Sequence, residues 1–150
     1  MILLLFGQPA SGKTTLGKKI AHEFAGINID GDKWREITDN KDYSREGRAR
    51  NLINAFNMAL YLESEGHFVV ISMVAPYKEQ RDYLRSKAAK LLSVYLEYDG
   101  SRGRDERFVK DFEVQDDEEG FRLNTSNVSI ESSLILIKTE ILKSVWAAND

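Results

Sequence analysis

The chain has 150 residues, of which 42% are hydrophobic and 30% charged, and its formal net charge at pH 7 is −3. This length supports one domain with its own core, and the negative balance excludes the overall basic field of proteins that bind duplex nucleic acid. The absence of cysteine excludes disulfides, thiolate metal sites and a cysteine nucleophile.

The secondary structure predicted along the chain alternates between strands and helices. The run ILLLF at residues 2–6 is apolar on both faces and predicts a buried strand, and TTLGKKIAHEF predicts a helix with Leu16, Ile20 and Phe24 on one face. A short strand in GINIDGD, a helix over 45–65, a strand in HFVVIS, a helix over about 78–90 and a strand in SVYLEY follow. FRLNT is a candidate fifth strand before a final helix over 129–147.

This alternation predicts an α/β fold, with a mostly parallel sheet covered by helices on both faces, and one domain over residues 1–150. The polar segment 99–120 is expected to be a lid or a disordered loop, and its acidic run 116–119 a solvated turn. The first apolar run is too short for a signal peptide, and no window approaches the roughly 20 apolar residues of a membrane span. We therefore expect a cytoplasmic protein without a membrane partner.

The stretch GQPASGKTT satisfies the phosphate-binding pattern G-x-x-x-x-G-K-[ST] and stands between the first predicted strand and helix. Its glycines let successive N–H groups turn inward around a phosphate, and the helix N-terminus adds positive potential. The Lys13 side chain is expected to reach the β and γ phosphates of ATP, and the Thr14 hydroxyl to bind Mg²⁺. The predicted nucleotide-binding residues are Gly7, Ala10, Ser11, Gly12, Lys13, Thr14 and Thr15.

Two carboxylates in the IDGD stretch favour a small-molecule kinase over other nucleotide-binding classes. The chain lacks the Asn-Lys-x-Asp motif with which GTPases read guanine, and the strand HFVVIS ends in Ser72 rather than the aspartate typical of motor ATPases. Asp32 is the candidate base that orients and deprotonates an acceptor hydroxyl, with Asp30 beside it. Turn formation and helix capping are the alternative roles for both aspartates.

Several arginines follow this stretch. Arg35 and Arg48, with Asn51 on the same predicted helix face as Arg48, are candidates to bind an anionic acceptor, because the planar guanidinium suits sulfate, phosphate or carboxylate. Arg45 and Arg50 are expected to be solvated.

The stretches IDGDKWR, YSREGRARN and VVISMVAPYKEQR resemble the adenylylsulfate kinase (APS kinase) family of P-loop kinases over roughly residues 1–85. The resemblance implies a three-layer P-loop kinase fold, an essential aspartate at Asp32, and an adenylylsulfate site formed by Arg35, Arg48 and Asn51. It also implies that Tyr43 stacks on the acceptor's adenine. Pro76 and Tyr77 then shape the wall of the acceptor pocket, with Val74 of the same stretch as a further substrate-binding residue, and Phe112 matches a phenylalanine that closes the other side of the adenine.

The chain departs from the family pattern at three places. Gly47 stands where the family has aspartate, Ala75 stands where it often has serine, and the aromatic and basic lid sequence is missing. The arginines of the 99–120 segment are candidates to replace the lid cations; they are Arg102, Arg104 and Arg107. A solvated charged loop is the alternative for the same three residues.

These features predict transfer of the γ-phosphoryl of ATP to a hydroxyl, by resemblance the 3′-hydroxyl of adenosine 5′-phosphosulfate. One alternative is a P-loop kinase acting on a nucleoside, a polynucleotide 5′-hydroxyl or a modified DNA base. Nucleic acid is expected to bind only as such an acceptor. A second alternative is a nucleotide-binding protein without catalysis. The expected partners are ATP, Mg²⁺ and a small anionic acceptor, and a homodimer stays open.

Overall fold

The computed structural model describes residues 1–147 and builds them around a five-stranded sheet in the order β2-β3-β1-β4-β5. Every pairing is parallel. The strands are β1 (Ile2–Phe6), β2 (Ile27–Asp30), β3 (Val69–Met73), β4 (Leu91–Glu97) and β5 (Phe121–Asn124). Because the pairings are all parallel, the carboxyl ends of the strands meet at one edge, where loops can form a ligand site.

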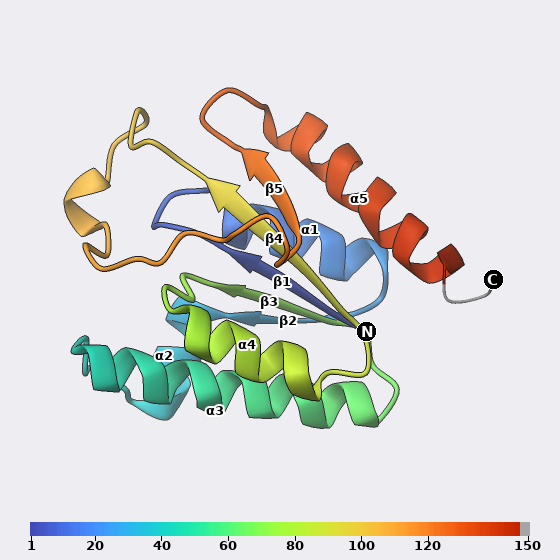
Figure 1. Ribbon diagram of the computed structural model, residues 1–150, viewed down its shortest axis with the longest axis horizontal. Coiled ribbons are helices and arrows are strands. Elements are labelled where there is room, and N and C mark those ends of the chain that lie inside the picture. Colours follow the sequence, from blue (N-terminus) through green and yellow to red (C-terminus); the bar gives the residue numbers. More distant parts are fainter. Residues whose placement is uncertain (148–150) are drawn as a thin grey trace.

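Helices cover both faces of the sheet, which confirms the three-layer α/β prediction (Figure 1). One face carries α1 (Lys13–Glu23) and α5 (Ile130–Ala147), and the other carries α2 (Gly31–Thr38), α3 (Arg45–Ser64) and α4 (Lys78–Lys87). Strand β1 is fully buried and serves both cores: Leu3 and Leu5 pack toward α1, whereas Ile2, Leu4 and Phe6 pack toward α3. None of the described helices is long and apolar enough to cross a membrane.

Helix α2 was missing from the sequence prediction. The structure ends β2 at Asp30 and starts α2 at Gly31, with the Asp30 carboxylate capping the helix by accepting from the Lys33 N–H at 3.3 Å. No residue of α2 is fully buried. Trp34 packs against the core and Ile37 is exposed, so this eight-residue helix shows no apolar stripe extending over several turns.

The predicted helix over 78–90 also ends early, at Lys87, because Ala88 is extended. The following backbone N–H groups of Ala89 and Lys90 donate to the Glu63 carboxylate of α3.

The 99–120 segment is ordered by contacts with the rest of the domain. It contains a short 3-10 turn, η1 (Asp105–Arg107), and crosses above the carboxyl edge of the sheet (Figure 1). The expectation of a solvated acidic turn was wrong for Glu119, which is 6% exposed. Its carboxylate accepts from Nε of the fully buried Arg81 at 3.1 Å, because a charge can be buried where it has a partner.

Candidate active site

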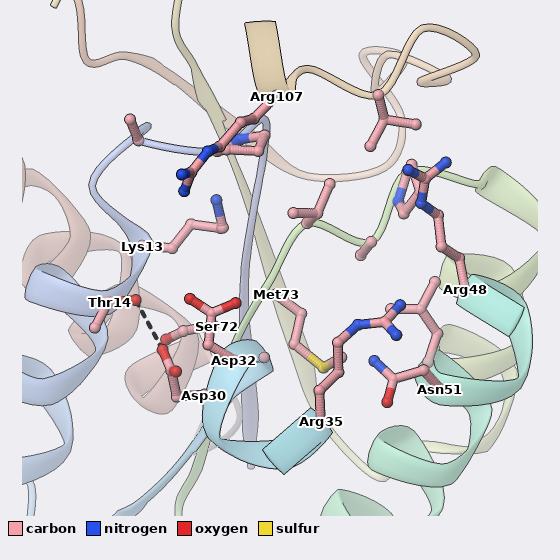
Figure 2. A pocket seen from close by; sticks show the side chains of 18 of the residues that line it. Lys13, Thr14, Asp30, Asp32, Arg35, Arg48, Asn51, Ser72, Met73 and Arg107 are labelled. Carbon is pink, nitrogen blue, oxygen red and sulfur yellow. Dashed lines mark hydrogen bonds between the residues drawn. The ribbon is translucent and has the colours of Figure 1, made fainter. Parts of the chain in front are cut away.

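A cavity of about 690 Å³ opens at the carboxyl edge of the sheet, between the phosphate loop, α2, α3 and the 99–120 segment. Figure 2 shows Lys13, Thr14 and Asp32 at one end of this cavity and Arg35, Arg48 and Asn51 at the other. The lining therefore brings together most of the site residues predicted from the sequence: Ala10, Gly12, Lys13, Thr14, Thr15, Asp30, Asp32, Arg35, Tyr43, Arg48, Asn51, Val74 and Pro76.

The phosphate loop requires glycine at two positions for different reasons. A Cβ at Gly7 would lie 2.3 Å from the Leu96 carbonyl oxygen, so the backbone of β4 leaves no room for a side chain. Gly12 has a φ of 100°, in the left-handed region that glycine adopts without strain, and it caps α1. Ala10 also has a positive φ, of 67°. The loop thereby turns directly into the N-terminus of α1, a favourable position for phosphate.

The Lys13 ammonium group is held inside this loop. It donates to the Gln8 carbonyl oxygen at 2.8 Å and to Oγ of the buried Ser11 at 3.2 Å. Loss of solvent around the ammonium lowers the pKa of Lys13 to about 8, although the charges of Asp32 and Asp30 act in the opposite direction. The Lys13 ammonium group bonds only to uncharged oxygens here, and a bound polyphosphate would give it an anionic partner.

Thr14 and Asp30 are suited to a divalent cation bound together with phosphate. The Thr14 hydroxyl donates to Oδ1 of Asp30 at 2.7 Å (Figure 2), so its proton points at the carboxylate and its lone pairs are available to a metal. Residues 1–147 contain no cluster of three or more acidic, histidine or cysteine side chains that could hold a metal alone. Mg²⁺ commonly takes one or two protein oxygens and completes its shell with water and phosphate, which fits this pair.

Asp32 lies in the first turn of α2, and its carboxylate faces the same end of the cavity as Lys13 (Figure 2). The helix start places it there: Asp30 caps the helix from the sheet edge, and Asp32 follows on the first turn over the cavity. A carboxylate in this position can accept a proton from a hydroxyl bound between it and the phosphate loop.

The opposite end of the cavity is cationic. Arg35 donates through Nη1 to the carbonyl oxygens of Asn40 and Asp42, at 3.1 and 3.2 Å, and its guanidinium lies 4.1 Å from the centre of the Tyr43 ring. Asn51 is 4% exposed, and its Oδ1 has no hydrogen-bond partner among the described residues. Because an unpaired buried amide oxygen is costly, it marks a position where a ligand can bind.

Arg104 and Arg107 complete the lining from above, and Figure 2 shows the Arg107 guanidinium directed toward Lys13. The sequence identified these arginines as candidate lid cations, and the structure brings both to the cavity. Arg102 does not line it; it donates instead to the carbonyl oxygens of Ala10 and Thr125.

Three of the predicted site residues do not line this cavity. Gly7 and Ser11 belong to the phosphate loop, where the buried Ser11 hydroxyl accepts from Lys13. Phe112 stacks on Phe6 and Tyr95, with ring centres 6.4 and 5.7 Å away, and lines a second cavity of about 300 Å³. The packing of these rings therefore keeps Phe112 outside the cavity that holds Tyr43.

Arg45 is exposed, as expected, and at the surface it pairs with Asp111 and Glu113 at 2.9 and 3.1 Å. Sequence reasoning missed Met73 and Val109 as lining residues. No motif marks them, because they reach the cavity only through the order of the strands and the path of the 99–120 segment.

Comparison with known proteins agrees with this geometry. The family model described as adenylylsulphate kinase matches residues 1–111. A cytidine diphosphoramidate kinase from Campylobacter jejuni is 31% identical over 103 residues, which cover 65% of this chain and 61% of that protein. A probable adenylyl-sulfate kinase from Pyrococcus abyssi is 31% identical over 98 residues, which cover 61% of this chain and 56% of that protein. The match thus spans less than two thirds of these relatives' length.

Solved structures share the whole fold. The APS kinase of Mycobacterium tuberculosis, in complex with AMPPNP and APS, has a TM-score of 0.75 at 19% identity and covers 96% of both chains. The shikimate kinase of Aquifex aeolicus has a TM-score of 0.70 at 12% identity and covers 97% of this chain and 99% of its own. At such identities the likeness concerns the fold, whereas the family match covers most of the sequence. The chain therefore belongs to the adenylylsulphate kinase family.

Proposed function

We propose that this protein is an ATP-dependent kinase that transfers the γ-phosphoryl of ATP to a hydroxyl of a small anionic nucleotide. One observation carries the proposal. A single cavity joins a phosphate loop and an aspartate at one end to a cationic acceptor end formed by Arg35 and Arg48. Phosphoryl transfer is catalysed mainly by positioning and charge, and this cavity offers a place for both substrates in line.

The roles of the side chains follow from their positions. Lys13 and the loop N–H groups bind the β and γ phosphates, and Asp32 accepts the proton of the acceptor hydroxyl as the hydroxyl oxygen attacks the γ-phosphorus. The bond from the γ-phosphorus to the bridging oxygen breaks, and ADP leaves. Arg104 and Arg107 stabilise the negative charge on the transferring group. Thr14 and Asp30 would hold Mg²⁺, which would neutralise charge on the phosphate oxygens.

Adenosine 5′-phosphosulfate, phosphorylated at its 3′-hydroxyl, is the acceptor we propose first. Family membership supports it, as does the presence of Arg35, Arg48 and Asn51 together in the cavity with Tyr43 at its rim. Tyr43 is 61% exposed and backed by Arg35, so its ring can stack on a base. ATP and Mg²⁺ are part of the same proposal.

A cytidine diphosphoramidate is the second candidate acceptor. The Campylobacter jejuni kinase of that compound is among the relatives at 31% identity. The absence of Phe112 from the cavity also leaves the acceptor's base with one aromatic neighbour instead of the two implied by the family pattern. A cytosine ring, smaller than adenine, needs less stacking surface.

The test is ADP release with ATP and Mg²⁺ in the presence of adenosine 5′-phosphosulfate, a cytidine diphosphoramidate, or a panel of nucleosides and 5′-hydroxyl oligonucleotides. Stimulation of at least about tenfold by one acceptor identifies it. Asp32→Asn is expected to lower turnover by roughly 100-fold or more while ATP affinity stays within about threefold. Glu36→Gln is the matched control, because Glu36 lies on the same helix in an exposed pair with Lys33. ATP binding without stimulation by any acceptor would favour a non-catalytic nucleotide-binding protein instead.

A further inference from the structure

The side chain of Gln8 joins the phosphate loop to the 99–120 segment. Its Nε2 donates to the Val109 carbonyl oxygen at 3.0 Å, and its Oε1 accepts from the Val109 N–H at 2.9 Å. The amide thus pairs with both polar groups of one backbone residue, as a neighbouring strand would. Val109 is 7% exposed, so both hydrogen bonds are largely shielded from water.

A second contact fixes the segment before η1. The Arg102 guanidinium donates to the carbonyl oxygens of Thr125 and Ala10, the latter at 3.1 Å. It also lies over the Tyr98 ring, 4.3 Å from its centre, and the Tyr98 hydroxyl accepts from the Arg102 N–H at 2.7 Å. Both ends of the stretch 102–109 are therefore tied to the phosphate loop, one at Ala10 and the other at Gln8.

Arg104 and Arg107 lie between these two anchors. Both line the cavity, and neither guanidinium has a hydrogen-bond or salt-bridge partner within residues 1–147. Arg104 has a φ of 67° and Gly103 a φ of 94°, so the backbone turns sharply between the anchors. The backbone path that carries the two cations is fixed at its ends by Gln8 and Arg102, and the Tyr98 hydroxyl also donates to the Gly103 carbonyl oxygen at 2.7 Å. The positions of the two cations follow from this path and not from contacts of their guanidinium groups.

We propose that Gln8 is a positioning residue for phosphoryl transfer: it holds the segment carrying Arg104 and Arg107 at a fixed distance from the phosphate loop. This inference rests on the proposed kinase function. The phosphate-binding pattern leaves residue 8 free to vary, so the motif itself does not require this amide. The role follows from its bidentate pairing with Val109.

Gln8→Met tests the proposal, because methionine keeps the length of the side chain and removes both hydrogen bonds. Turnover with the preferred acceptor is expected to fall roughly 10- to 100-fold, with ATP affinity changed less than about threefold, since a displaced cation affects the transition state most. Asn57→Ala is the control: it removes an exposed amide of α3 that accepts from the Tyr83 hydroxyl of α4, and neither residue lines the cavity.

A double-mutant cycle separates positioning from general damage. In an Arg104→Ala/Arg107→Ala background, Gln8→Met should lower turnover by less than about twofold, because the cations through which Gln8 acts are gone. An equal loss of turnover in both backgrounds would overturn the proposal and indicate that Gln8 maintains the conformation of the phosphate loop instead. Unchanged turnover of Gln8→Met in the wild-type background would also overturn it.

Hydrogen exchange of the free protein tests the contact between Gln8 and Val109 without relying on kinase activity. The Val109 amide should exchange at least about tenfold faster in Gln8→Met, while the amides of β4 keep their rates. If the wild type transfers phosphoryl to no acceptor, the proposed function fails, whereas faster Val109 exchange would still support Gln8 as the anchor of this segment. An unchanged Val109 rate overturns the anchor itself.

Discussion

The Thr14 hydroxyl donates a hydrogen bond of 2.7 Å to Oδ1 of Asp30, joining the first turn of α1 to the end of β2. The other oxygen of the same carboxylate caps α2 by accepting from the Lys33 N–H. One carboxyl group therefore orients the candidate metal ligand and also starts the helix that carries Asp32. These two roles can be separated, because a hydrogen-bond acceptor suffices for the cap whereas the metal prefers a negative charge.

Asp30→Asn keeps an acceptor for the helix cap and removes the charge. We expect its free energy of unfolding to change by less than about 1 kcal/mol, while the Mg²⁺ concentration for half-maximal turnover rises about tenfold. Asp30→Ala should show both losses, with about 1 kcal/mol of stability lost with the cap. Denaturant titration and Mg²⁺ titration measure the two effects, and an unchanged Mg²⁺ requirement in both variants would remove Asp30 from the metal site.

The lowered pKa of Lys13 predicts that ATP binding takes up a proton at alkaline pH. The pKa of Lys13 is about 8 in the free protein, and bound phosphates raise it, so above pH 8 the complex holds more protons than the free protein. ATP affinity should therefore fall as the pH rises through 8. The uptake should be about 0.1 proton at pH 7 and approach about 0.9 at pH 9.

Calorimetric titrations in two buffers of different ionisation enthalpy measure this uptake. Lys13→Arg is the control, because guanidinium does not titrate in this range and the uptake should vanish at both pH values. The same pKa has a consequence for the free protein. Between pH 8 and 10.5 the unfolded chain binds more protons at Lys13 than the folded protein does, so this residue makes the protein more stable as the pH rises.

Arg81 is expected to be the most sensitive charged residue for stability. It is fully buried, and besides Glu119 it donates to the carbonyl oxygens of Ala75 and Glu113, at 2.9 and 2.8 Å. Arg81→Ala leaves the Glu119 carboxylate without its cationic partner, with only the Asp116 N–H still donating to it, and removes the donors to both carbonyl oxygens; this should cost about 3–5 kcal/mol. Lys78→Ala, which removes an exposed pair with Asp82 on the same helix, should cost less than about 1 kcal/mol. Similar losses for the two variants in thermal or denaturant unfolding would contradict the prediction.

Gly47 stands where the family pattern has aspartate, and we predict that replacing it even with alanine destabilises the protein. A Cβ at this position would lie 2.2 Å from Cγ and 2.4 Å from the carbonyl oxygen of Asp42, because the turn before α3 packs against the helix. Helix propensity alone predicts that Gly47→Ala stabilises the protein by up to about 1 kcal/mol. We expect a loss of about 1–3 kcal/mol instead, because the turn must move. The sign of the change in unfolding free energy decides between the two effects.

The strand and helix pattern was readable from the sequence because burial left a periodic signature. The run ILLLF is apolar at every position, as a central parallel strand must be, and it occupies the middle of the sheet between β3 and β4. The phosphate loop was equally clear, because Gly7 and Gly12 meet backbone constraints that other residues cannot. Helix α2 left no such signature, since it has only eight residues and packs on the core through Trp34 without a repeating apolar face.

The sequence by itself determined the layer architecture, the phosphate loop and many of the residue types that line the cavity, because each depends on short-range periodicity or on local backbone geometry. Only the tertiary structure decided which side chains share the cavity. In the structure Phe112 stacks on Phe6 and Tyr95 and does not line the cavity. Glu119 is buried in contact with Arg81, and Gln8 bonds to Val109, which lies 101 residues away in the sequence. Such partners are set by the order of the parallel strands and the path of the chain over their carboxyl edge. Neither leaves a periodic trace in the sequence.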